Sequence, residues 1–95
     1  MSLFFFVLAF GQEDRQLLRG KVLYRGSNVP NENVINATAE TATITTDEGE
    51  FLIGVKEGDQ LVFTAVNYQL EVITITQDIL KNNRLVVEVT EKVTE

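Results

Sequence analysis

Two acidic stretches hold the residues with the most evident chemistry. Asp47, Glu48 and Glu50 lie close together, and Glu57 and Asp59 follow after a short apolar run. Carboxylates grouped in loops are typical ligands of Ca²⁺, although this spacing differs from the helix–loop–helix calcium pattern. Asp also forms turns by bonding to nearby backbone groups, which accounts for Asp47 and Asp59 without a ligand. Asp47, Glu48 and Glu50 are therefore the metal candidates, and a structural role in turns is the simpler interpretation.

Paired carboxylates can also hydrolyse glycosides. That reaction needs a deep cleft, which a sandwich domain of only 95 residues rarely forms. The chain contains no His and no Cys. These absences exclude His- and Cys-dependent triads, the common zinc sites and disulfides. We therefore expect no catalytic residue, no enzymatic activity and no cofactor.

Two tyrosines, Tyr24 and Tyr68, offer a different chemistry. A pair of exposed aromatic rings can stack on the apolar faces of sugars, so a glycan is one possible ligand. The simpler interpretation is that Tyr68 closes the core at the corner of a strand, with its hydroxyl at the rim.

The charge balance limits the classes of partner. The net charge is −6, with only 8 Lys and Arg residues. Phosphate backbones and anionic lipids are bound by clustered cations. We therefore expect neither a nucleic-acid partner nor a basic contact with a membrane, and the acidity serves solubility.

The first residues indicate export. Residues 3–10 form an unbroken apolar run, shorter than the about 20 residues that span a bilayer but within the about 7–15 of a secretory signal. Residues 1–11 are thus predicted to be a signal peptide, cleaved after Gly11, although no Lys or Arg precedes the run. The alternative is a buried first β-strand. A retained run would have to bury itself, for example against another copy of the chain; after its removal we expect no direct membrane insertion.

The elements that must position these side chains are short strands between turn residues. A polar segment covers residues 12–17, a single β domain residues 18–90, and a frayed tail residues 91–95. Apolar residues alternate along about seven strands, the pattern of an immunoglobulin-like sandwich. These predicted strands are residues 18–24, 33–38, 42–45, 50–55, 60–66, 70–76 and 85–89.

Several local features refine this prediction. A hairpin is predicted across Gly49, joining residues 42–45 to residues 50–55. The apolar phase shifts between Val72 and Ile73, which predicts a bulge. Residues 76–81 are predicted to form one helical turn before the last strand, capped by Thr76.

The order of these motifs resembles a known family. The stretches Gly20-Lys21-Val22, Asn33-Val34, residues 45–53, residues 58–63 and Tyr68 follow one another as in the carboxypeptidase regulatory-like domain of exported proteins from Gram-negative bacteria. The similarity runs from about Leu18 to Val89, nearly the whole predicted mature chain. The motif residues are turn and core positions: Gly20, Val22, Val34, Asp47, Gly49, Phe51, Ile53, Gly58, Asp59, Leu61, Phe63 and Tyr68.

This resemblance implies a transthyretin-like, seven-stranded Greek-key sandwich. It also implies an accessory, non-catalytic role, since such domains often precede TonB-dependent receptors or stand in short exported proteins. We therefore expect an interaction module in the periplasm or at the outer membrane, whose partner is another protein domain or chain. A carbohydrate-binding module using exposed aromatics is the alternative.

Overall fold

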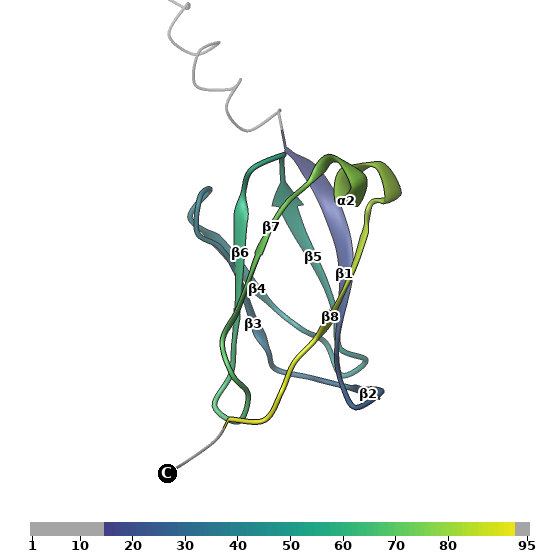
Figure 1. Ribbon diagram of the computed structural model, residues 1–95, viewed down its shortest axis with the longest axis vertical. Helices are drawn as coiled ribbons and strands as arrows, with labels where there is room; N and C mark the ends of the chain where they lie inside the picture. Colours follow the sequence, from purple (N-terminus) through teal and green to yellow (C-terminus); the bar gives the residue numbers. More distant parts are fainter. Residues whose placement is uncertain (1–14, 93–95) are drawn as a thin grey trace, which may run out of the picture.

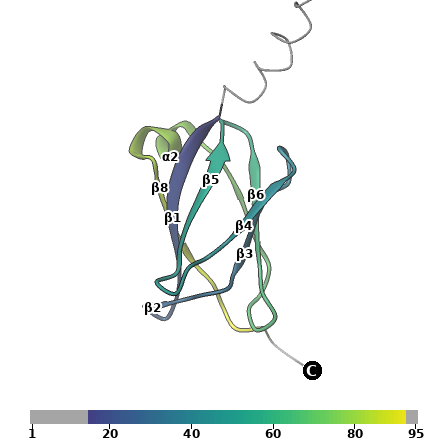
Figure 2. The same cartoon turned by 180° about the vertical axis from the view of Figure 1, so that it is seen from behind.

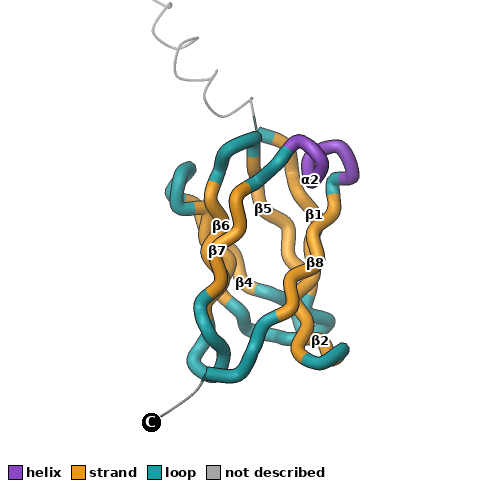
Figure 3. The backbone as a smooth tube through the Cα atoms, in the orientation of Figure 1, coloured by secondary structure: helices purple, strands orange, loops and turns teal. Residues whose placement is uncertain are grey.

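The computed structural model describes residues 15–92, which form a β-sandwich with one short helix (Figure 1). Strands fill the middle of the molecule, and the loops gather at its two ends (Figure 3). The eight strands in this part of the chain are β1 (Gln16–Tyr24), β2 (Ser27–Asn28), β3 (Asn33–Asn36), β4 (Thr41–Ile44), β5 (Glu50–Val55), β6 (Gln60–Thr64), β7 (Glu71–Thr74) and β8 (Arg84–Glu88). The helix α2 (Gln77–Asn82) lies between β7 and β8.

The strands divide into two four-stranded sheets. Sheet A is built on β1, which pairs antiparallel with β2 and β5 and parallel with β8. Sheet B has the antiparallel order β4-β3-β6-β7. The two sheets lie side by side along the long axis of the molecule, as the two opposite views show (Figures 1 and 2). The all-β sandwich class predicted from the sequence is therefore confirmed.

The core lies between the sheets and follows the predicted alternation. On β1, Leu18 and Val22 are buried, while Leu17 and Arg19 are exposed. Phe51 of sheet A meets Phe63 of sheet B edge to face, with ring centroids 5.6 Å apart. The buried apolar side chains are Leu18, Val22, Val29, Val34, Phe51, Ile53, Val55, Leu61, Phe63, Ile75, Val87 and Val89. Burial of these residues is the main force that holds the two sheets together.

The helix closes the end of the sandwich at which β1 begins (Figure 1). Thr76 caps it as predicted, because its hydroxyl accepts a hydrogen bond from the Ile79 amide at 3.3 Å. Asn83 ends it in the left-handed conformation, with φ 51°. Ile79 and Leu80 are half-buried and pack against the core.

Two predictions about local pairing are wrong. Residues 42–45 and 50–55 do not form a hairpin, because β4 belongs to sheet B and β5 to sheet A. The turn across Gly49 therefore carries the chain from one sheet to the other. No bulge separates Val72 from Ile73, because β7 pairs with β6 in continuous register. Val72 and Ile73 lie on opposite faces of the strand. The change in the apolar pattern therefore arises because Val72 is an apolar side chain on the outer face.

The boundaries of the domain also differ from expectation. Gln16 and Leu17, assigned to the polar segment before the domain, are the first residues of β1. Ser27 and Asn28, which lie between two predicted strands, form the additional short strand β2. Glu91, assigned to a frayed tail, forms an isolated bridge with Tyr68. The predicted signal peptide and cleavage site lie outside the described residues. Within residues 15–92, no helix is both long and apolar enough to span a bilayer.

Candidate functional site

A buried ion pair joins the start of the described chain to the turn between β5 and β6. Asp59 is 1% exposed. Arg15 approaches it in a bidentate geometry, with Nε donating to Oδ2 at 2.8 Å and Nη2 donating to Oδ1 at 3.1 Å. Planar guanidinium–carboxylate pairs of this kind are among the stronger charged contacts in proteins.

Asn36 and Lys56 complete the surroundings of this carboxylate. Oδ2 of Asp59 also accepts from the Asn36 amide at 2.9 Å and from the Lys56 backbone at 3.0 Å. Burial alone would raise the pKa of Asp59, but these hydrogen bonds and the Arg15 charge outweigh it and hold the pKa below its usual range. An ionised carboxylate with both oxygens occupied is poorly suited to proton transfer. The cluster therefore serves the fold by joining β1, β3 and the β5–β6 turn.

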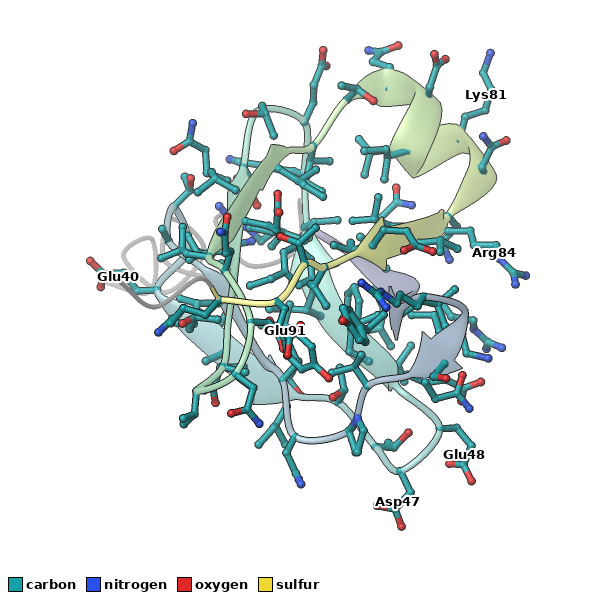
Figure 4. All side chains as sticks on the ribbon, turned by 60° about the horizontal axis from the view of Figure 1, so that its bottom comes forward. Glu40, Asp47, Glu48, Lys81, Arg84 and Glu91 are labelled. Atoms are coloured by element: carbon teal, nitrogen blue, oxygen red, sulfur yellow. The ribbon has the colours of Figure 1, made fainter. Side chains whose placement is uncertain are left out.

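Two of the calcium candidates, Asp47 and Glu48, occupy the turn between β4 and β5, and the third, Glu50, is the first residue of β5. The side chains of Asp47 and Glu48 extend outward from the molecule (Figure 4). Thr46 organises this turn, since its hydroxyl accepts from the Glu48 and Glu50 amides, each at 3.3 Å. Within residues 15–92 no group of three or more acidic side chains converges as metal ligands would. The sequence suggested that Asp47 bonds the backbone of this turn, whereas the structure gives that role to Thr46.

A second acidic residue, Glu32, is buried, and its carboxylate has no hydrogen-bond partner among the described residues. Its exposed fraction is 0%. Its backbone is well held, because its amide donates to Oγ1 of Thr45 at 2.8 Å. Burial raises the pKa of Glu32. Such a group favours the neutral form, since an isolated buried charge is costly.

The two tyrosines meet, but they do not form a flat platform. Their ring centroids are 5.2 Å apart, and the ring planes are inclined by 49°. Both rings are half-buried and pack against the core. The Tyr24 hydroxyl donates to Oε1 of Glu91 at 3.2 Å. This arrangement agrees with Tyr68 as a residue that closes one end of the core.

The outer face of sheet B is largely apolar. Ala42 pairs with Ile35, Ile35 with Val62, and Val62 with Val72, so one apolar row crosses all four strands. Ile44 and Val72 are 50% and 51% exposed, and Leu70, just before β7, is 59% exposed. The other outward positions of these strands are Asn33, Gln60, Thr64 and Thr74. The four strands therefore place no charged side chain on this face, which we call the sheet B face.

A groove lies on the open side of the sandwich, between the edges of β4 and β5. It has a volume of about 540 Å³, and its lining includes Leu17, Ala42 and Leu52. The one charged side chain in the lining is Arg15, whose guanidinium is bound to Asp59. The groove thus lacks the convergent polar groups that a catalytic cleft requires.

The motif residues singled out in the sequence lie mainly in the core and turns. Phe51, Ile53, Leu61 and Phe63 line the core, while Gly49 and Gly58 occupy turns with positive φ. Sequence reasoning missed Arg15, Asn36 and Glu32. A signal for two of them exists: Glu32, Val34 and Asn36 alternate on the inward face of β3 and its lead-in. No local signal identifies Arg15 as the partner of Asp59.

No family model matches this chain, and no curated protein matches it.

Proposed function

We propose that this domain is a non-catalytic interaction module that docks another protein through the sheet B face. The observation that carries the proposal is the apolar row from Ala42 to Val72 in the middle of an uncharged sheet surface. Soluble monomers rarely leave contiguous apolar patches of more than a few hundred Å² exposed, and such patches are typical of docking sites.

The contrast with sheet A strengthens this assignment. The outer face of sheet A also exposes apolar side chains, Leu17, Leu52 and Val86. They are interspersed there with charged residues, namely Arg19, Lys21, Glu50, Arg84 and Glu88, as expected of a face in contact with water. Val62 and Ile35 of sheet B are only half-buried, and no further layer formed by residues 15–92 covers them. Covering the sheet B face would remove this apolar surface from water at no cost in buried charge.

The resemblance described above supplies the cellular context of the proposal. An accessory domain with transthyretin-like, seven-stranded Greek-key connectivity would serve an exported protein of a Gram-negative bacterium. The periplasm or the outer membrane, including the front of a TonB-dependent receptor, is the proposed location. The apolar run of residues 3–10 supports export.

Carbohydrate binding is less well supported. A sugar-stacking site needs accessible aromatic faces, and the tilted, half-buried rings of Tyr24 and Tyr68 offer little of them. Binding to a glycan array with high-micromolar affinity or better, lost on substitution of Tyr24, would favour that function over the present proposal.

Site-specific photocrosslinking in the producing cells tests the docking face. A benzoylphenylalanine residue is placed at Val72 on the sheet B face or at Glu88 on the outer face of sheet A. We expect a discrete protein adduct from position 72 and little from position 88. The substitution Ile44→Glu should abolish the adduct, because it buries a charge in the interface.

The matched control is Val86→Glu, an equivalent change at a side chain that is 49% exposed on sheet A. It should leave the adduct from position 72 unchanged. Circular dichroism of each purified variant verifies folding. Equal adducts from both positions, or an adduct insensitive to Ile44→Glu, would refute docking through the sheet B face.

A further inference from the structure

Two arginines stand side by side on the outer face of sheet A. Arg19 of β1 and Arg84 of β8 are register partners in the parallel pairing. Parallel partners direct their side chains to the same face of a sheet, and both residues are exposed. Neither guanidinium has a hydrogen bond or ion pair with another described residue.

A third cation and a hollow complete the cluster. Lys21 lies two positions along β1 from Arg19, and thus on the same face. Arg19, Lys21 and Arg84 line a hollow of about 130 Å³ together with Glu50. This volume is well above the about 10–15 Å³ that a single water requires, so the hollow has room for a small polyatomic ligand.

The acidic residues nearby do not neutralise this cluster. Glu50 is the register partner of Lys21, on the side of β1 away from Arg84. Glu88 is the partner of Leu23, four residues along β8 from Arg84 and therefore about 13 Å away at about 3.3 Å per residue. The three cations around the hollow face one carboxylate, which leaves a surplus of positive charge in a chain whose net charge is −6.

Like charges directly opposite one another on neighbouring strands destabilise a sheet. An anion between them converts this repulsion into attraction, and paired guanidinium groups match the oxygens of carboxylate and phosphate. We propose that Arg19, Arg84 and Lys21 form a binding site for an oxyanion, either a phosphate or a carboxylate. This site lies on the opposite sheet from the proposed docking face and is independent of it.

The side chains of Arg84 and Lys81 extend outward from the molecule (Figure 4). The guanidinium of Arg84 is therefore accessible to a ligand from solution.

Nuclear magnetic resonance titration of the purified domain tests the site. Inorganic phosphate is added at constant ionic strength, with sodium chloride as the reference. We expect saturable amide shifts confined to the strands around Arg19, Lys21 and Arg84. The substitutions Arg19→Gln and Arg84→Gln should each weaken phosphate binding at least about fivefold, since a hydrogen bond to a charged group contributes more than a neutral one.

Two further variants test the direction in which the affinity for phosphate changes. Glu50→Gln should strengthen phosphate binding, because it removes the carboxylate that competes for Lys21. Arg25→Gln, which makes the same change in net charge in the turn between β1 and β2, should leave the affinity unchanged. All these side chains except the half-buried Lys21 are exposed, so the variants are expected to fold.

A short peptide rich in aspartate and glutamate, titrated in parallel, distinguishes the source of the oxyanion. Tighter binding of the peptide assigns the site to carboxylates of a partner protein, and tighter binding of phosphate assigns it to a free ligand. Shifts that match those in chloride, fail to saturate, or respond equally to Arg25→Gln and Arg84→Gln would overturn the proposal.

Discussion

Arg15 and Asp59, separated by 44 positions in the sequence, form a bidentate ion pair with Nε–Oδ2 and Nη2–Oδ1 distances of 2.8 Å and 3.1 Å. Asp59 is buried, whereas the Arg15 side chain is 19% exposed. The pair joins the residue before β1 to the turn that leads into β6. Its position makes it a strong candidate for a determinant of stability.

Removing the arginine should cost more than removing a surface charge. Arg15→Ala leaves a buried carboxylate without its cation, and we expect the free energy of unfolding to fall by about 3 kcal/mol. The matched control Arg25→Ala, at an exposed turn where the guanidinium lies 5.3 Å from the centroid of the Tyr24 ring, should lower it by no more than about 1 kcal/mol. Urea unfolding followed by circular dichroism measures both. Similar losses for the two variants would show that the pair contributes little.

The lowered pKa of Asp59 predicts acid sensitivity. A carboxyl whose folded pKa is below its ordinary value of 3.8 stabilises the fold above that value. This stability is lost as the pH falls from about 3.8 through the folded pKa, because the unfolded chain takes up the proton first. Urea midpoints measured from about pH 7 to about pH 2 should show this loss. The loss should be smaller in Asp59→Asn, which lacks the titrating group; an identical acid profile would contradict the assignment.

Glu32 should have the opposite effect on stability. Burial raises its folded pKa above the ordinary 4.5, so the unfolded chain ionises first and stability falls as the pH rises from about 4.5 through the folded pKa. Glu32→Gln removes this ionisation, and it should stabilise the protein at neutral pH by on the order of 1 kcal/mol. Thermal unfolding near neutral pH and near pH 4 measures the difference. Glu48→Gln, at an exposed turn, is the control and should have little effect; a destabilised Glu32→Gln variant would mean that the carboxylate is bound.

Gly49 is required by both its conformation and its surroundings. Its φ is 77°, and a Cβ there would lie 2.8 Å from the Val22 carbonyl oxygen and 2.9 Å from the Val29 nitrogen. Gly58 has a similar φ of 90°, but nothing lies within 4 Å of a Cβ at that position.

Comparison of Gly49→Ala with Gly58→Ala therefore separates strain from crowding. We expect Gly58→Ala to cost about 1 kcal/mol through backbone strain alone. Gly49→Ala should cost at least about 1 kcal/mol more, because the backbone of β1 must move. Equal losses in chemical denaturation would show that the contact with Val22 is unimportant.

The strands themselves were predictable because their signal is local. On β1, Leu18 and Val22 lie on the same face as Gly20, with Arg19 and Lys21 on the other face, and burial follows this period of two directly. On β6, Leu61 and Phe63 are buried and the intervening Val62 is less so. The cap at Thr76 was equally predictable, since the side chain and the amide that it accepts are only three residues apart.

The candidate sites were less accessible to sequence reasoning. Asp59 was predicted to stabilise a turn, and it does accept from the Lys56 amide, but its main partner is distant. The acidic turn at Asp47 and Glu48 was a candidate metal site because its charges are adjacent in sequence. The uncharged sheet B face was not predicted, because its members come from four separate strands.

The sequence by itself determined most of the segments that become strands and the side chains that point inward in them, because both depend on alternation between neighbouring residues. The short strand β2 was not among those segments. Only the tertiary structure decided that β4 and β5 enter different sheets, since the turn across Gly49 is compatible with a hairpin or a crossover. It also decided that Arg15 meets Asp59 and that Arg19 lies beside Arg84. Such contacts depend on how distant strands pair in register, and that register is set by the packing of the whole core.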